Sequence, residues 1–214
     1  SATYRILRGV KNRFGSTNEI GVFEMQSMGL QEVENPSALM LSGKLNGVSG
    51  STICSVIEGT RPIFVEIQAL TTPTAFGNPR RMATGLDYNR LSLILAVLEK
   101  RAGLFFNSLD VYLNVVGGLK LYEPSSDLAI TASLISAFKD TPIDSDICFF
   151  GEVGLSGEVR AVPNAAGRVA EMARMGFTKC VLPKGCYKQV MNIDTKGLKL
   201  IFITTVNELK EILE

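Results

Sequence analysis

The consecutive serines Ser125 and Ser126 stand where a nucleophile could act, directly before a stretch with helical periodicity. A serine hydroxyl is a weak nucleophile unless a base lies beside it. The chain contains no histidine, so Ser-His-Asp triads, Cys-His pairs and histidine-bound metals are excluded. Lys120 is an amine that could in principle rotate toward the serines. The structural alternative is that one of the serines caps the helix, because serine is favoured at this position.

A second candidate is the polar turn Lys11-Asn12-Arg13-Phe14-Gly15, in which two cations flank a tight bend. In ring ATPases, a cation from the neighbouring subunit stabilises the charge that develops on the transferred phosphoryl group. From the residues alone, a solvated basic turn is the commoner explanation. The phosphate-binding pattern GxxxxGKS/T is missing, so we expect that this chain does not hydrolyse ATP by itself.

The composition is that of a soluble protein with a sizeable core. Of the 214 residues, 46% are hydrophobic, which is enough for one large domain, or for one domain and part of another. The formal charge of +1 gives no overall bias toward nucleic acid or membrane. Four cysteines without a CxxC pair predict buried thiols and no metal site. Neither a secretory signal nor an apolar stretch of about 18 residues is present, so we expect an intracellular protein with no membrane partner.

The elements that would position these residues fall into two regions. Residues 3–10 and 20–25 alternate as the strands of a hairpin, and the Asn-Pro step at residues 35–36 predicts a boundary. A hairpin alone is seldom stable, so this one belongs to a larger domain. Beyond residue 42, alternating strands and helices predict an α/β domain.

In this second region we expect the loop at 71–84, the hairpin at 151–163, strands at 50–57, 61–70, 110–116, 147–150, 179–182 and 199–203, and helices at 88–101, 127–139, 165–175 and 206–213. Asp87 and Gly103 are the expected cap and stop of the first helix.

Several segments resemble the bacterial RadA (Sms) family, and together they extend over essentially the whole chain. The most specific is the KNRFG segment at residues 11–15, within a similar run at 7–23. Residues 66–70 and 80–87 continue the resemblance. Residues 151–163 resemble a hairpin that RadA shares with the Lon peptidase domain.

The resemblance implies a domain organisation. Residues 1–36 would be the C-terminal fragment of a RecA-like ATPase core that carries the KNRFG motif, and residues 37–214 would be a Lon protease-like domain with the ribosomal-protein domain 2-like fold. The expected fold class is therefore α/β (α+β), preceded by a remnant hairpin. ATP and Mg would bind the full-length protein and Zn its N-terminal motif, so no cofactor is expected in this chain.

The resemblance also implies a function. The family is known as a hexameric, DNA-bound ATPase that promotes branch migration or helicase-like unwinding in recombinational repair. Its implied partners are single-stranded or branched DNA, further copies of itself in a ring, and a recombinase of the RecA type. The implied location is the bacterial cytoplasm, near the nucleoid, or an organelle of bacterial origin. Lys11 and Arg13 would act in trans on the ATPase site of the neighbouring subunit, with Asn12, Phe14 and Gly15 completing the motif.

The same resemblance places Ser125 at the position of the Lon nucleophile when residues 123–129 are laid on the Lon pattern G-P-S-A-G-I-A. Both glycines of that pattern are carboxylates here, Glu123 and Asp127, and the Lon lysine falls at Ala166. Arg168 cannot replace that lysine, because a guanidinium stays protonated. We therefore expect a non-proteolytic scaffold that guides DNA, and the alternative is a Lon-type serine peptidase using Ser125.

Five cations, Arg80, Arg81, Arg90, Lys120 and Arg160, are expected on loops or strand ends. In a ring of six copies they could line the central channel and bind phosphates without reading bases. Solvated surface charge is the alternative for each of them. The resemblance favours Lys120 and Arg160, which end segments shared across the Lon-like surface.

Overall fold

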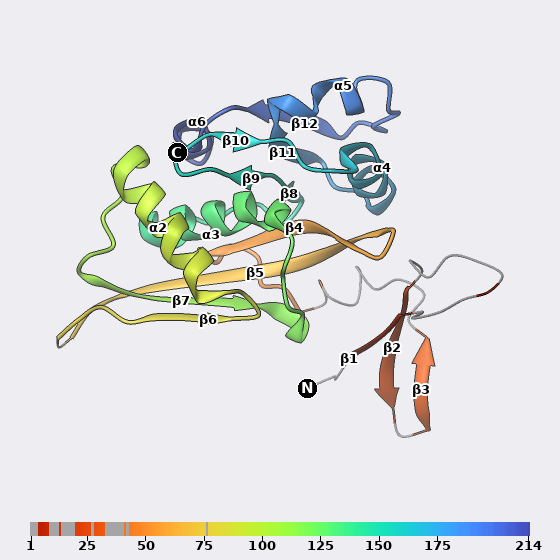
Figure 1. Cartoon of the computed structure of the whole chain (residues 1–214), viewed down its shortest axis with the longest axis horizontal. Coiled ribbons are helices and arrows are strands. Elements are labelled where there is room, and N and C mark those ends of the chain that lie inside the picture. Colours follow the sequence, from red (N-terminus) through yellow and green to blue (C-terminus); the bar gives the residue numbers. More distant parts are fainter. Residues whose placement is uncertain are drawn as a thin grey trace.

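The computed structural model describes residues 4–8, 13, 20–26, 28–32, 41, 43–75 and 77–214. Figure 1 shows a small sheet formed by the first strands and a larger α/β body formed by the rest of the chain. The α/β class expected from the sequence is confirmed.

The small sheet is antiparallel, with the strand order β1-β2-β3. Its strands are β1 (Tyr4–Arg8), β2 (Ile20–Gln26) and β3 (Gly29–Glu32). The sequence predicts the hairpin of the first two strands, but it does not predict β3, because this short strand lacks apolar alternation. The boundary predicted at residue 36 lies outside the described residues.

The large sheet has seven strands in the order β12-β11-β8-β4-β5-β7-β6. Its strands are β4 (Ser51–Glu58), β5 (Arg61–Pro73), β6 (Arg81–Thr84), β7 (Leu109–Val115), β8 (Ile147–Phe149), β11 (Lys179–Pro183) and β12 (Lys199–Ile203). The pairing is mostly parallel, and β5 is antiparallel to both of its neighbours. The predicted hairpin at residues 151–163 is confirmed as β9 (Glu152–Val153) paired with β10 (Val159–Arg160).

The helices are α2 (Tyr88–Ala102), α3 (Asp127–Lys139), α4 (Ala165–Met175), α5 (Tyr187–Val190) and α6 (Val206–Ile212), with short 3-10 turns η1 (Val116–Gly118), η2 (Pro124–Ser126) and η3 (Lys184–Cys186). Among the described residues, none of these helices has the length and apolar character needed to cross a bilayer. The cap and stop predicted for α2 are confirmed. Asp87 accepts hydrogen bonds from two backbone N–H groups, and Gly103 takes the left-handed conformation at φ 67°.

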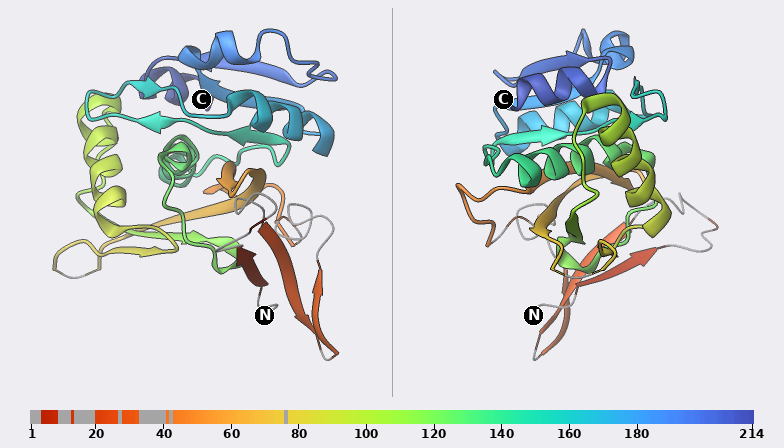
Figure 2. Two further views of the ribbon diagram at one scale, coloured as in Figure 1. Left: turned by 45° about the vertical axis from the view of Figure 1, so that its right-hand side comes forward. Right: turned by 90° about the vertical axis from the view of Figure 1, so that its left-hand side faces the viewer.

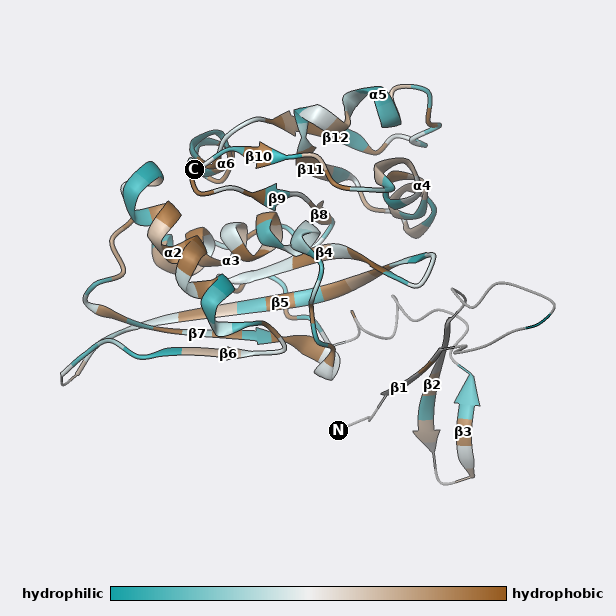
Figure 3. Cartoon of the chain, viewed as in Figure 1, coloured by the Kyte–Doolittle hydropathy of each residue, from teal (hydrophilic) through white to brown (hydrophobic). Residues whose placement is uncertain are grey.

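Alternate residues of the central strands enter two different cores, because successive side chains of a strand point to opposite faces. On one face, Cys54 and Phe149 pack beneath α2, α3 and α6. On the other, Ile53 and Cys148 pack against α4 and α5. Figure 2 shows α2 and α3 on the same side of the long strands, and Figure 3 shows hydrophobic residues along β4 and β5 and on the helices above them. The segment between α2 and α3 contains β7, a strand of this sheet, so the sheet positions the start of α3.

The bounds predicted for the loop at residues 71–84 are wrong at both ends, because strands occupy both of its ends. β5 continues to Pro73, and residues 81–84 form β6, which pairs in parallel with β7 at the edge of the sheet. Proline and glycine in this segment mark only the turn between the strands. An edge strand of four residues has little apolar alternation of its own, because it forms mainly by pairing its backbone with the neighbouring strand. The turns η1, η2 and η3 and the single-turn helix α5 also have no clear signal in the sequence.

Candidate functional site

Ser125 lies in the turn η2, directly before α3, and its side chain is fully buried. Its hydroxyl accepts a hydrogen bond from Nη1 of Arg168 at 3.2 Å and donates one to the backbone carbonyl of Ser55 at 3.5 Å. Neither a guanidinium nor a carbonyl oxygen can remove the proton of a serine at neutral pH. These partners therefore hold Ser125 in place without activating it.

Arg168 extends from α4 into the core and is fully buried. Its guanidinium forms an ion pair with Glu123 and donates hydrogen bonds to the carbonyls of Ser55 at 2.5 Å and Pro163 at 3.2 Å. The centre of the guanidinium lies 5.6 Å from the ring centroid of Phe150, within the range of a cation–π contact. A buried charge is tolerated when it is paired and its donors are bonded, which is the case here. Arg168 is thus the hub of a buried polar network around Ser125.

Ala166, where the resemblance places the lysine of Lon, is half-buried on the same helix, two residues before Arg168. A methyl group cannot accept a proton, so this position offers no base. Lys120 has an exposed side chain, and the hydrogen bonds of the Ser125 hydroxyl go to other partners.

The prediction that Ser125 or Ser126 caps α3 is wrong. Ser126 occupies the N-cap position, but its hydroxyl donates to the carbonyl of Glu123 at 3.0 Å and caps no backbone N–H group. Its backbone is already helical, at φ −76° and ψ −15°, whereas a capping serine has an extended backbone. The turn η2 therefore runs directly into α3, and the N–H of Leu128 bonds to the carbonyl of Gly151 at 3.0 Å instead.

A second ion pair joins Arg90 of α2 to Asp127, the first residue of α3. Nε of Arg90 lies 2.7 Å from one carboxylate oxygen, and Nη2 contacts the other oxygen and donates to the carbonyl of Val153 at 3.0 Å. The N–H of Val153 donates to the same carboxylate at 3.0 Å. Burial raises the pKa of Asp127, although these donors oppose the shift. The pair ties α2, α3 and β9 together.

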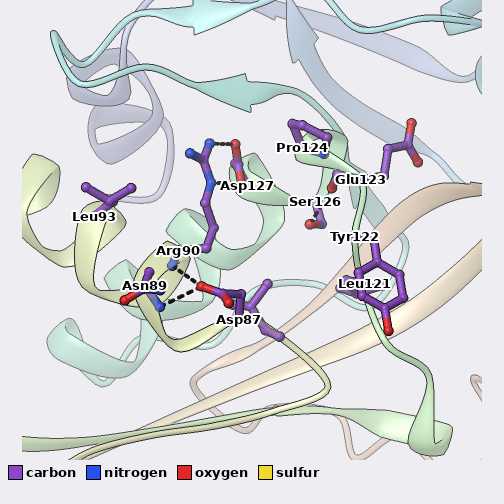
Figure 4. A pocket seen from close by; sticks show the side chains of 11 residues that line it. Asp87, Asn89, Arg90, Leu93, Leu121, Tyr122, Glu123, Pro124, Ser126 and Asp127 are labelled. Atoms are coloured by element: carbon purple, nitrogen blue, oxygen red, sulfur yellow. Dashed lines mark hydrogen bonds and ion pairs between the residues drawn. The ribbon is translucent and has the colours of Figure 1, made fainter.

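A pocket of about 340 Å³ opens between the start of α2 and the segment that precedes α3 (Figure 4). It is lined by Leu86, Asp87, Asn89, Arg90, Leu93, Leu121, Tyr122, Glu123, Pro124, Ser126 and Asp127. Ser126 lines this pocket, while the buried Ser125 does not. The aromatic ring at its rim, Tyr122, is 85% exposed. The pocket therefore offers apolar and hydrogen-bonding surface without an activated nucleophile.

The five predicted DNA-binding cations differ in their exposure and in the partners that they have within the chain. Arg90 lies on a helix, not on a loop or strand end, and its guanidinium bonds within the chain. Arg81 donates to two backbone carbonyls of residues 106–109, at 2.7 and 2.5 Å. Arg160 is exposed and forms an ion pair with a neighbouring glutamate at 2.7 Å. Arg80 and Lys120 are exposed. The structure thus gives Arg81 and Arg90 structural partners that the sequence does not reveal.

Two carboxylates of the site, Glu123 and Asp127, have roles that sequence reasoning missed. A signal was present, because each replaces a glycine of the Lon pattern. Their arginine partners are 45 and 37 residues away in the sequence, and no local spacing rule connects such positions. The exposed Tyr122 had no signal in the sequence that would distinguish it from a core aromatic residue.

Of the predicted trans-acting motif, the structure describes Arg13 alone, and this residue is exposed. Lys11, Asn12, Phe14 and Gly15 lie outside the described residues, so their role stays a prediction. Within the part of the chain that the structure describes, no group of three or more cysteine, aspartate and glutamate side chains could hold a metal ion.

The fold, with Ser125 in the turn before α3, points to one class of protein. The chain belongs to the family of the Lon protease (S16) C-terminal proteolytic domain, whose model matches residues 95–214. The predicted Lon-like fold is thereby confirmed.

The chain is also similar to particular proteins along almost its whole length. It is 54% identical over 210 residues to DNA repair protein RadA of Bacillus subtilis (strain 168), a match that covers 96% of this chain and 44% of that protein. It is 53% identical over 206 residues to DNA repair protein RadA of Streptococcus pneumoniae (strain ATCC BAA-255 / R6), covering 96% of this chain and 49% of that protein. The predicted resemblance to RadA is confirmed, and the chain spans less than half the length of these relatives.

Proposed function

We propose that this chain is a non-proteolytic scaffold and DNA-guiding domain of a RadA-type DNA repair protein. The observation that carries the first half of the proposal is the state of Ser125, which is buried and bonded to a guanidinium that cannot serve as a base. The similarity to DNA repair protein RadA supports the second half. In the whole protein, this domain would belong to a DNA-dependent ATPase that uses ATP to drive branch migration or the unwinding of DNA.

The alternative function is a Lon-type serine peptidase. Catalysis by Ser125 needs an amine of lowered pKa beside the hydroxyl, and Ala166 supplies none. It also needs an open path for a peptide to Ser125, while the side chain of this residue is fully buried. The peptidase would therefore require a rearrangement of the whole network around Arg168.

The remaining parts of the proposal concern the ring. Six copies assembled as a closed ring would place Lys120 and Arg160 along a channel, where exposed cations neutralise phosphates. Arg80 would add a third exposed cation. At the other end of the chain, Lys11 and Arg13 would reach the ATPase site of the neighbouring subunit, with bound ATP and Mg supplied by the whole protein. A recombinase of the RecA type would be the partner in repair.

Binding to single-stranded and branched DNA over a salt series tests the DNA-guiding role, with the mass of the protein measured in the same buffers. The variant Lys120→Ala/Arg160→Ala should bind more weakly than the wild type, and on single strands the magnitude of its salt slope should fall by about 1.4 for each subunit in contact. The control Lys188→Ala/Lys199→Ala removes two other exposed lysines and should leave binding unchanged. Equal losses in both variants would show that net charge, not this surface, determines binding.

A fluorophosphonate probe tests the non-proteolytic role, because it labels activated serines. We expect no labelling of the wild type. Labelling that disappears in Ser125→Ala would establish the peptidase instead.

A further inference from the structure

Tyr122 is the aromatic residue that stands out from the surface next to the pocket. Its side chain is 85% exposed, while the preceding Leu121 is only 7% exposed. Lys120, two residues before Tyr122, is also exposed. A cation and an exposed aromatic ring thus lie on one short segment and line the same two pockets.

Concave surface surrounds this ring. Tyr122 lines the pocket of about 340 Å³ and two further pockets of about 170 Å³ and 290 Å³. Lys120 lines the two smaller ones as well. Figure 4 shows the ring of Tyr122 apart from the ion pair of Arg90 and Asp127. A flat group could therefore lie against the ring beside the lysine.

The carboxylates around the ring are occupied within the chain. Glu123 pairs with Arg168 and accepts the N–H of Ile57 at 2.8 Å. Asp127 pairs with Arg90, and Asp87 caps α2. The fourth, Glu58, also interacts within the protein. These partners reduce the repulsion that an approaching anion would meet, and Lys120 adds attraction.

We propose that Tyr122 is a stacking platform for a base of single-stranded DNA, with Lys120 on a neighbouring phosphate. This inference rests on the DNA-guiding role proposed above and names the residue that would give the surface its preference for single strands. Exposed aromatic rings beside cations bind unpaired bases irrespective of sequence, because every base has a flat face. In a duplex, the faces of the bases are already stacked on one another, so Tyr122 would contribute little there.

The test compares the wild type with Tyr122→Ala and Tyr122→Phe by fluorescence anisotropy, using a labelled oligodeoxythymidine and a duplex of the same length. Tyr122→Ala should weaken binding to the single strand by roughly 5- to 150-fold and leave duplex binding unchanged. Tyr122→Phe keeps the ring and should bind as the wild type does. The matched control is Tyr187→Ala, which removes a tyrosine that is 52% exposed on α5 and should have no effect. Thermal melts of all variants check folding.

Tyrosine emission gives a second readout, because the chain has 5 tyrosines and no tryptophan. Stacking should quench part of this emission when the single strand binds, and the quenching should be lost in Tyr122→Phe although affinity is kept. If the wild type binds single strands and Tyr122→Ala binds them equally well, this inference fails while the DNA-guiding role stands. If the wild type binds neither DNA, both fail. If Tyr122→Ala loses binding of labelled unfolded casein but not of the single strand, the surface is a peptide site and the inference is overturned.

Discussion

Replacing Arg168 with methionine should destabilise the fold strongly, because this side chain joins α4 to the segment before α3. Arg168→Met keeps much of the apolar stem but removes the ion pair with Glu123. It also removes the hydrogen bonds to Ser125 and to the carbonyls of Ser55 and Pro163. The loss is therefore that of one partner of a buried charge pair, together with donors to three other groups.

Breaking a buried ion pair by removing one partner costs about 3–5 kcal/mol. Arg168 is fully buried, but the side chain of Glu123 is 26% exposed, so water can partly solvate the carboxylate that is left. We therefore expect the lower end, about 3 kcal/mol of unfolding free energy. Adding Glu123→Gln removes the unpaired charge. The loss of unfolding free energy in the double variant should therefore be smaller, by about 0.5–3 kcal/mol, than the sum of the losses in the two single variants.

Urea unfolding followed by tyrosine emission and circular dichroism gives these free energies by linear extrapolation. The control is Arg174→Met, which breaks an ion pair with Glu171 in which the arginine side chain is 53% exposed. Exposed pairs contribute about 1 kcal/mol or less. If Arg168→Met is no more destabilised than this control, or if the losses at Arg168 and Glu123 add without coupling, the network does not hold the site as argued.

Two further predictions concern titratable groups. Burial raises the pKa of all four thiols, so a thiol reagent should label none of them in the native protein and all four in urea; rapid labelling of the native protein would contradict their place in the core. Hydrogen bonds from Thr204 lower the pKa of Glu208, so its carboxylate stabilises the fold above its ordinary pKa, and this contribution is lost as the pH falls through the lowered pKa. Glu208→Gln should melt below the wild type at pH 7 and converge with it in acid, and a difference that persists in acid would refute this.

The elements that could be predicted from the sequence are those with a hydrophobic periodicity of their own or with residues that mark where they begin and end. The helix that begins at Asp87 and stops at Gly103 has a cap, an apolar stripe and a glycine stop within one window. The strands missed, β3 and β6, are four residues long and have at least two exposed members each. Both strands lie at the edge of their sheet, and β6 pairs with β7, which is distant in the sequence, so local sequence carries little information about them.

Some features of the candidate site could likewise be predicted from the sequence, and others could not. Ala166 could be identified as a missing base because the resemblance aligns a short motif, and this alignment needs no coordinates. The burial of Ser125 could not be predicted, because it depends on a side chain from α4 that reaches the turn before α3. The chemistry of a guanidinium excludes Arg168 as a base from the sequence alone, but its structural role follows only from three-dimensional contacts.

The differences from the Lon pattern form a matched set. The two glycines of that pattern are Glu123 and Asp127 here, and each of these carboxylates is paired with an arginine from another helix. Either carboxylate without its arginine would be a poorly solvated charge, and so would Arg168 without its partner. A lysine placed at position 166 would therefore leave Ser125 buried and bonded to Arg168. The fold uses these side chains to join its helices, so a peptidase could be regained only by changing the pairs together with the base.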